Sequence, residues 1–239
     1  ASKWVKIVEL FKEHKDTHGI DFDKGGDKTT PLNIASSQGQ TEIVEILLDS
    51  CTNLNDGSAS IACYSNRLDV VRLLLTRSSG RAKKEKYDGK PEIDFNRRHG
   101  QHKMTPFMIA CNKKNGESIE EGRRQQESLL NLKNDRGYTG LLIAAHAGFT
   151  NAVKAILTCE SRRDVDPNIK NDAKLDALYY ALILSYGDIA KLLIDHPSID
   201  LTTTYDVNRN TLMHVACQGS DLEIVKYLMR HSNLDFMSE

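Results

Sequence analysis

The residues of this sequence that could do chemistry are its eight His and five Cys, but their spacing fits no catalytic or metal-binding pattern. His99 and His102 lie close together, yet no neighbouring Cys or carboxylate completes a set of metal ligands. No two Cys have C-x-x-C spacing, and the patterns H-E-x-x-H, G-x-S-x-G and G-x-G-x-x-G are absent. We therefore expect no enzyme activity, no bound metal and no cofactor in these 239 residues.

What recurs instead is a short pattern that sets the length of a structural unit. A small or capping residue is followed by apolar residues and then by Ala. The clearest copies are Thr30–Ala35, Thr105–Ala110, Thr139–Ala144, Asp176–Ala181 and Thr211–Ala216. From Thr105–Ala110 onward they follow one another at intervals of about 35 residues, a period typical of repeat architectures.

Each copy predicts a short helix followed by a second one. Thr30 and Thr105 are suitable N-caps, and the Pro after each suits the first helical position. Gly39 and Gly148 stand where the chain leaves the first helix and needs a left-handed residue. The segments that follow place apolar residues at i, i+1, i+4 and i+5, a helical stripe too broad to leave in water. These segments are Glu42–Leu48, Asp69–Leu75, Asn151–Leu157, Asp188–Ile194 and Glu223–Met229.

These features resemble the ankyrin repeat, whose signature T-P-L-H-x-A is followed by a second helix and a hairpin-like turn. The resemblance implies an all-α solenoid of stacked helix-turn-helix units in a single domain, 1–239. It also implies that His214, at the motif His position, holds the turn through hydrogen bonds. The expected units are a half repeat at 1–23 and repeats at 24–55, 56–96, 97–133, 134–170, 171–204 and 205–239.

Two repeats depart from the pattern. The first helix of repeat 56–96 is shortened, so either that helix is clipped or the recorded chain lacks a few residues. Where repeat 97–133 should carry its second helix, Ser118–Gln126 keeps one apolar residue, which predicts a degenerate helix or a loop and the weakest packing of the array. In the half repeat, Trp4 is expected to seal the end of the stack, and the alternative is that it anchors a partner.

Composition favours a cytoplasmic protein. The net charge is −1, with 39% hydrophobic and 27% charged residues, and no apolar run approaches the roughly 18 residues that cross a bilayer. The N-terminus lacks the apolar region of a signal peptide. Cys63, Cys111 and Cys217 each follow a motif Ala, so we expect buried, reduced thiols. Because the sequence stops inside the last turn, we expect it to be part of a longer protein.

The resemblance places a binding surface on the concave face, formed by turn tips and exposed sides of first helices. An exposed apolar or aromatic stripe on such a face indicates a partner. The alternative is that Ile183 and Leu184 are tucked into contacts between repeats. The expected partner-binding residues are Tyr64, Met104, Asn112, Lys113, Tyr138, His146, Ile183, Leu184 and Gln218.

A basic segment offers a second candidate site. A polar insert at about 77–91, punctuated by Gly and Pro, predicts a projecting loop. It could recruit an acidic protein or a phosphoinositide headgroup, whereas nucleic acid is disfavoured by the overall negative charge. The alternative is a solvated loop whose charges do little. The basic residues in question are Arg81, Lys83, Lys84, Lys86, Arg97 and Arg98.

The sequence therefore predicts a non-enzymatic scaffold or adaptor that binds a protein on its concave face. The main alternative is a regulatory or targeting domain of a longer enzyme or membrane protein, in which the stack contacts its own chain.

Overall fold

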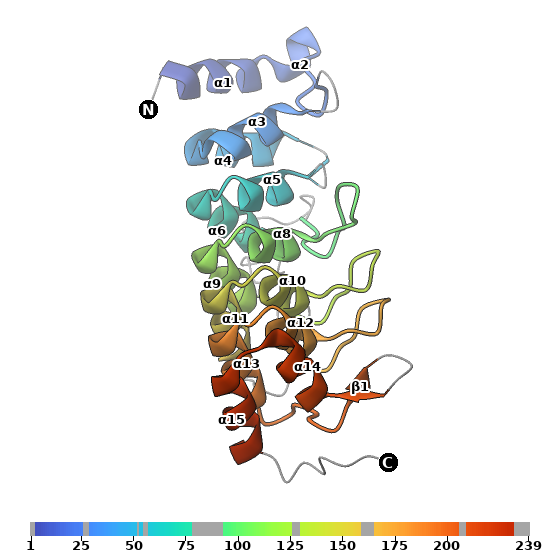
Figure 1. Ribbon diagram of the computed structural model, residues 1–239. Coiled ribbons are helices and arrows are strands. Elements are labelled where there is room, and N and C mark those ends of the chain that lie inside the picture. The colour runs from blue at the N-terminus through green and yellow to red at the C-terminus, as the bar shows by residue number, and fades with distance from the viewer. Residues whose placement is uncertain are drawn as a thin grey trace. The chain divides into compact units, whose positions relative to one another are not determined.

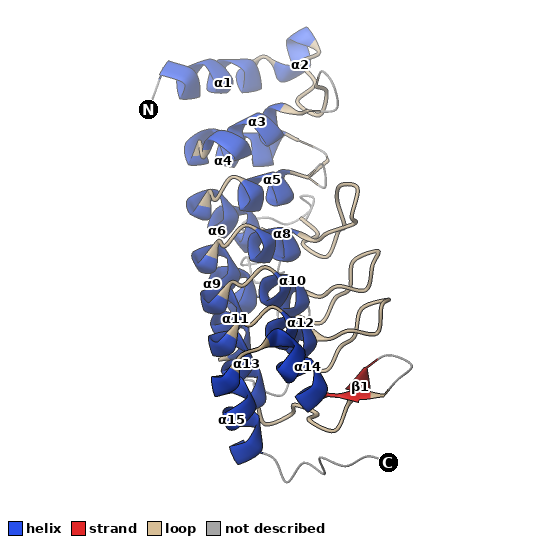
Figure 2. Ribbon diagram, in the orientation of Figure 1, coloured by secondary structure: helices blue, strands red, loops and turns tan. Residues whose placement is uncertain are grey.

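The computed structural model describes residues 3–25, 29–51, 53–54, 57–77, 93–125, 130–158, 165–205 and 209–231. The chain divides into two compact units, the N-terminal unit Ala1–Lys113 and the C-terminal unit Lys114–Glu239. In the described part of both units the regular structure is helical, apart from two short strands (Figure 2).

The N-terminal unit consists of two layers of helices. First helices α3, α5 and α8 pack on one another in that order, and second helices α1, α4 and α6 form the other layer (Figure 1). Within a repeat, α3 packs on α4 and α5 packs on α6. The helices are α1 (Lys3–Glu13), α2 (Lys15–His18), α3 (Pro31–Gln38), α4 (Thr41–Ser50), α5 (Ser58–Tyr64), α6 (Leu68–Thr76) and α8 (Pro106–Asn112).

The C-terminal unit repeats this arrangement. First helices α10, α12 and α14 pack in order, and second helices α9, α11, α13 and α15 pack in order beside them. Strands β1 and β2 pair antiparallel as the hairpin before α14. The elements are α9 (Gly116–Gln125), α10 (Gly140–His146), α11 (Thr150–Leu157), α12 (Ala177–Ile183), α13 (Gly187–Ile194), β1 (Thr204–Tyr205), β2 (Asn210–Thr211), α14 (Leu212–Gly219) and α15 (Leu222–His231).

The first helices begin where the sequence predicts. The side-chain oxygens of Thr105, Thr139 and Asp176 each accept a hydrogen bond from the backbone N–H three residues later, at 3.3, 3.2 and 2.8 Å. These bonds satisfy a donor that the helix leaves unpaired. Pro31 and Pro106 occupy the first helical position, as expected.

The residues predicted to shape the turns also behave as expected. Gly39 and Gly148 have φ angles of 76° and 71°, which confirms the left-handed conformation. The ring nitrogen Nδ1 of His214 accepts a hydrogen bond from the Thr211 N–H at 3.2 Å, so this His caps its own helix. The structural role expected of His214 is confirmed.

The core of each unit is formed where neighbouring helices meet. The motif Ala residues are almost completely buried, and so are the apolar stripes of α4, α6, α11 and α13. On α15, Ile224 and Leu228 are buried whereas Met229 is 56% exposed. A small side chain at the motif position lets adjacent first helices approach closely, and the apolar stripes then exclude water behind them. The motif residues are Ala35, Ala62, Ala110, Ala144, Ala181 and Ala216.

Of the two alternatives for repeat 56–96, the clipped first helix is wrong. Its first helix, α5, has seven residues, the same length as α8, α10 and α12, so it is not clipped. The sequence is shorter in the segment between the end of α4 at Ser50 and the start of α5 at Ser58. A connection can shorten without loss of the helix because the helix, and not the connection, supplies the packing surface.

The uncertain segment of repeat 97–133 is a helix, so the loop alternative is wrong and the degenerate helix is confirmed. Its one apolar residue, Ile119, is fully buried, and α9 packs against α11. Ser118 beside it is also buried. A single well-placed side chain therefore keeps α9 in the second-helix layer, and local opening here remains a prediction.

Two expectations about burial meet different outcomes. Cys63 and Cys111 are buried, and burial raises the pKa of the Cys63 thiol to about 12. Cys217 is exposed, so its predicted burial is wrong. It lies on α14, and in the described residues no further first helix follows to cover it. Trp4 is 65% exposed, so the prediction that it seals the stack is also wrong.

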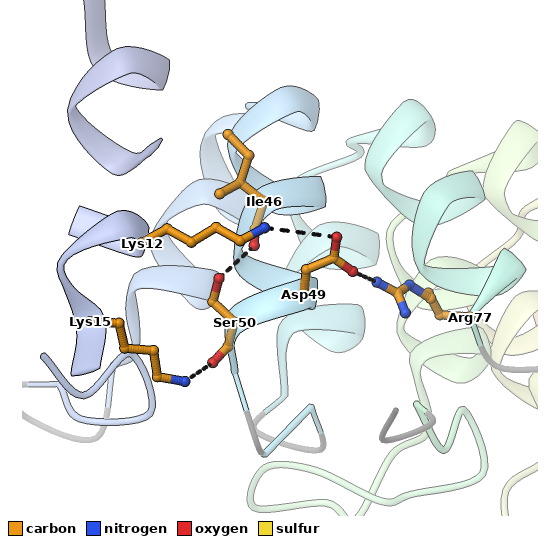
Figure 3. Close-up of polar contacts among 6 residues, drawn as sticks. All are labelled: Lys12, Lys15, Ile46, Asp49, Ser50 and Arg77. Carbon is orange, nitrogen blue, oxygen red and sulfur yellow. Dashed lines mark hydrogen bonds and ion pairs between the residues drawn. The ribbon is translucent and has the colours of Figure 1, made fainter. Parts of the chain in front are cut away.

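The half repeat is attached to the stack by polar contacts at the end of α4 (Figure 3). Asp49 lies 4.0 Å from the Lys12 Nζ and also accepts a hydrogen bond from the buried Arg77 at the end of α6. Lys15 donates to the backbone carbonyl of Ser50. Asp49 thus links helices from three successive repeats.

The N-cap of α10 gives a first stability prediction. Thr139→Val keeps the side-chain shape but removes the oxygen that accepts from the Leu142 N–H, so we expect the free energy of unfolding to fall by about 1 kcal/mol. Urea unfolding followed by circular dichroism measures the change. Thr139→Ser, which retains the acceptor, should cost clearly less, and equal losses in both variants would contradict a capping role.

Candidate functional site

Two hairpin turns of the C-terminal unit, at 134–138 and 171–175, have the same pattern of hydrogen bonds. The Asn134 N–H donates to the Tyr138 backbone carbonyl at 2.9 Å, and the Asn134 side-chain oxygen accepts from the Tyr138 N–H at 2.9 Å. Asn171 and Leu175 repeat these contacts. At Gly137 the φ angle is 76° and an added Cβ would lie 2.7 Å from the Asp172 side chain, so only glycine fits between the turns.

Three ring side chains, Tyr138, His146 and Tyr180, lie together on the first-helix side of this unit and form what we call the aromatic cluster. The Tyr138 and Tyr180 hydroxyls are 2.8 Å apart and their rings are stacked, with centroids 6.1 Å apart. The His146 ring meets Tyr180 edge-on at 4.7 Å. Such offset and edge-to-face arrangements are favourable for aromatic pairs. His146 is exposed and both Tyr side chains are half-buried, so the cluster is open to a partner.

The hydroxyls of the cluster retain hydrogen-bonding capacity. Asn171 donates to the Tyr180 hydroxyl oxygen at 3.0 Å. Burial and the contact with Tyr138 raise the pKa of Tyr180 to about 12, so the Tyr180 phenol keeps its proton near neutral pH. The bond between the two hydroxyls uses one of their two protons. The other is available to an acceptor on a partner, because no acceptor for it is found among the described side chains.

A buried polar pair, Asp176 and Tyr205, lies next to the cluster and is linked to it through Tyr179. The Tyr205 hydroxyl lies 2.9 and 2.8 Å from the two carboxylate oxygens of Asp176, which also caps α12. Tyr205 contacts the ring of Tyr179, which in turn meets Tyr180 edge-on. Burial raises the pKa of Asp176 above its ordinary value, although the hydrogen bonds from Tyr179 and Tyr205 oppose the shift. This pair ties the β1–β2 hairpin to the helix that carries Tyr180.

The structure brings two of the predicted partner-binding residues of this unit together, and Tyr180 joins them. Tyr138 and His146 both belong to the aromatic cluster, with ring centroids 6.3 Å apart. Leu184 caps the end of α12 and is 41% exposed, whereas Ile183 is half-buried and Gln218 on α14 is exposed. We did not predict Tyr180. The feature of the sequence that could have indicated Tyr180 is its place directly before the motif Ala, where the other repeats have Ile or Val.

In the N-terminal unit, two predicted residues also meet. The Lys113 ammonium lies 4.0 Å from the centroid of the Tyr64 ring, within range of a cation–π interaction, and Tyr64 is 61% exposed. Asn112 is exposed at the end of α8. Met104 is half-buried in the turn before α8, where it pairs with His99 through two backbone hydrogen bonds.

The basic candidate site is described only in part. Arg97 and Arg98 are exposed in the loop before α8. The other four residues, Arg81, Lys83, Lys84 and Lys86, lie outside the described residues.

The described residues contain neither a candidate metal site nor a membrane-spanning helix. No cluster of three or more His, Cys, Asp or Glu side chains could hold a metal ion there. No helix in the same ranges is both long enough and apolar enough to cross a membrane.

Comparison with known proteins identifies the repeat. A sequence model of ankyrin repeats matches three times over residues 1–88 and 107–204, and a single-repeat model matches residues 208–238. The chain belongs to the ankyrin-repeat family. Ankyrin repeats are generally protein–protein interaction modules, and the expected all-α ankyrin fold is confirmed.

The relatives of this ankyrin chain are distant. Mouse Rabankyrin-5 is 23% identical over 172 residues, which are 70% of this chain and 13% of the mouse protein. Human Rabankyrin-5 is 24% identical over 171 residues, again 13% of its length. Among solved structures, the ankyrin repeat domain of Bcl-3, a member of the IkappaB family, matches with a TM-score of 0.74 at 17% identity, covering 94% of this chain and 91% of that one. The ankyrin repeat protein EF0377 matches with a TM-score of 0.68 at 26% identity, covering 84% and 97%.

The Asp176–Tyr205 pair predicts a stability change that depends on pH. Tyr205→Phe removes a donor to the buried carboxylate, so we expect the free energy of unfolding to fall by about 2 kcal/mol at pH 7. The folded pKa of Asp176 lies above the ordinary 3.8, so the stability it contributes is greatest below that value and is lost as the pH rises through the raised pKa. Without Tyr205 that pKa rises further. The loss caused by the substitution should therefore shrink on acidification, as more of the carboxyl is protonated.

Urea unfolding at pH 7 and pH 5 measures this difference. Tyr227→Phe is the matched control, because its hydroxyl donates to the more exposed Asp195 at 2.7 Å, and it should cost less than about 0.5 kcal/mol at either pH. An equal loss at both pH values for Tyr205→Phe would show that Asp176 does not respond to the missing hydroxyl.

Proposed function

We propose that this chain is a non-enzymatic protein-binding scaffold that holds its partner on the first-helix side, with the aromatic cluster as the main contact of the C-terminal unit. The observation that carries the proposal is the cluster itself, three rings in mutual contact with His146 exposed and both Tyr side chains half-buried. Aromatic side chains contribute large contact areas at small entropic cost and are common energetic centres of interfaces.

The chemistry of the cluster favours a particular kind of contact. The ring faces and Leu184 suit an apolar or aromatic side chain of the partner. The remaining phenolic proton suits a backbone carbonyl or a carboxylate beside it. A peptide segment supplies both groups on successive residues. In the N-terminal unit, Tyr64 with Lys113, Met104 and Asn112 would form a separate contact region in the same proposal.

A second candidate function is a regulatory or targeting domain within a longer protein. The matched region is 13% of the length of Rabankyrin-5, which shows that a related segment occurs within a much longer chain. In this version the stack contacts its own polypeptide, and the basic insert could bind an acidic segment or a phosphoinositide. The described residues of the basic site, Arg97 and Arg98, are exposed, which is compatible with either role.

A pair of surface substitutions tests the main proposal. His146→Glu together with Leu184→Glu places one charge in the cluster and one at the end of the helix that carries Tyr180, and both positions are exposed, so the fold should be retained. We expect a partner captured by the unchanged protein to bind the variant at least about tenfold more weakly. The partner would lose the apolar contact with Leu184, and the two new carboxylates would be unfavourable beside its apolar or acidic groups. Capture from lysate followed by titration calorimetry with the purified partner measures the change.

The control is Leu222→Glu on α15, an equally apolar and 64% exposed position in the second-helix layer. It should bind as the unchanged protein does, and circular dichroism should be the same for all three proteins. A partner that tolerates the double variant but is lost when Arg81, Lys83, Lys84 and Lys86 become Glu would move the function to the basic insert.

A further inference from the structure

Basic residues hold a hairpin position whose backbone conformation favours glycine. It is the second residue before the N-cap of a first helix, and its φ angle is positive at Gly137, Lys174 and Arg209, at 76°, 64° and 54°. In the N-terminal unit Lys103 holds the same position before α8, with a φ angle of 49°. A side chain is strained in this conformation, and the residues that tolerate it best are Asn, Asp and His. Backbone geometry therefore does not explain Lys or Arg here, and a strained residue of this kind points to a function.

These side chains form a row of positive charge in the C-terminal unit. The hairpins before α10, α12 and α14 project from the same side of the helices, one after another (Figure 1). Gly137 carries no charge, but Arg136 beside it does. Arg136, Lys174 and Arg209 are exposed, and none of the ion pairs between described side chains involves them. Each of three successive hairpins thus presents one cation, and we call Arg136, Lys174 and Arg209 the cationic row.

The spacing of the cationic row follows from the stacking of the first helices. Helix α12 packs on both α10 and α14, and helices that pack directly are about 8–10 Å apart. In a β-strand the side chains of one face recur about every 7 Å, which is too short. In a polyproline II helix they recur at every third residue, about every 9 Å, which matches the row. An α-helix reaches this spacing only with residues seven apart, about 10.5 Å.

The aromatic cluster beside the row favours polyproline II over an α-helix. Tyr138 directly follows Gly137, so the cluster and the row share the hairpin 134–138. A polyproline II segment has no internal hydrogen bonds, so its carbonyls can accept the remaining phenolic proton of the cluster. The carbonyls within an α-helix are already bonded. Proline rings also pack on aromatic side chains, which is how aromatic-lined grooves hold Pro-rich segments.

Two carboxylates on the same hairpins limit which acidic segment can bind. Asp135 and Asp172 are exposed, one directly before Arg136 and the other two residues before Lys174. Asp172 also lies close to Gly137, where an added Cβ would be 2.7 Å from its carboxylate oxygen. A segment that is acidic throughout would bring charges against both Asp side chains, whereas one with a carboxylate at every third residue can place each charge at a cation. Spacing as well as net charge therefore decides binding.

We infer that the cationic row and the aromatic cluster together bind an acidic, proline-rich segment of a protein partner, held in the polyproline II conformation with a carboxylate at every third residue. The inference deepens the proposed function, on which it rests, by naming the kind of segment that the first-helix side of the C-terminal unit holds. The five Pro of the 239 residues are far apart in sequence, so these residues contain no such segment themselves. Because polyproline II is already extended, the segment loses little conformational entropy on binding.

Titration with a synthetic peptide, followed by nuclear magnetic resonance of the isotope-labelled protein, tests the inference. The probe is a repeat of Glu-Pro-Pro about twelve residues long, and the comparison peptide has the same composition with all Glu placed before all Pro. The probe should bind saturably and shift the N–H signals of Lys174 and Arg209. The comparison peptide should bind at least about tenfold more weakly, because its charges do not match the row. Added salt should weaken binding of the probe, because exposed charges are screened.

A pair of glycine substitutions separates loss of a contact from loss of the fold. Lys174→Gly together with Arg209→Gly removes two cations and relieves the strain at both positions, so the variant should be at least as stable as the unchanged protein. It should nevertheless bind the probe at least about tenfold more weakly. The matched control is Lys154→Ala with Arg230→Ala, which removes the same charge from exposed positions on α11 and α15 and should leave binding unchanged.

Three outcomes would overturn the inference. They are equal affinity for the two peptides, equal binding by the glycine variant and the unchanged protein, and no binding of the probe at millimolar concentration. The proposed function is judged separately, by whether a captured partner is lost in the variant carrying His146→Glu and Leu184→Glu. If that partner is lost while the probe fails to bind, the proposed function stands and the polyproline II segment is wrong.

Discussion

The close approach of neighbouring first helices is the constraint on which both units depend. A repeat of two short helices cannot bury its apolar faces without neighbours, so stability comes from contacts between repeats. The motif Ala makes these contacts possible, because a larger side chain at Ala62 or Ala181 would push the helices apart. The N-caps then fix where each helix starts, and so which residues meet across the interface.

Stacking also decides which surfaces remain available for binding. It uses the motif Ala and the apolar stripes of the second helices, but it leaves part of the hairpin turns and of the first-helix side exposed, including His146 and Leu184. Tyr180 shows how a packing position can be extended into that exposed region. Where Ile109 and Val215 end inside the interface, the phenol of Tyr180 reaches the hydroxyl of Tyr138 and the side chain of Asn171. A Tyr at this one position thus extends a packing position into the exposed aromatic cluster.

The sequence allowed us to predict the features that depend on local rules. Capping by Thr105, the turn at Gly39 and the helical stripes follow from the residues themselves. The failures at Cys217, Trp4 and Tyr180 concern residues whose environment depends on a neighbouring repeat. Cys217 and Trp4 have the side chains of buried residues, but in the described chain no helix covers them. Tyr180 was missed for the same reason, because its contacts come from the preceding repeat and from the hairpin tip at Asn171.

The polar network beneath the aromatic cluster has a consequence for affinity. Asp176 is fixed by its cap to α12 and by Tyr205 from the next hairpin, and the ring contact between Tyr205 and Tyr179 carries that rigidity to Tyr180. A surface whose rings are already oriented loses little side-chain entropy when a partner binds, so more of the contact energy appears as affinity. Burying the Asp176 carboxylate costs free energy, and its hydrogen bonds with the Tyr179 N–H and the Tyr205 hydroxyl offset that cost. The same hydrogen bonds fix the position of α12 and the β1–β2 hairpin, and so keep the rings oriented before a partner binds.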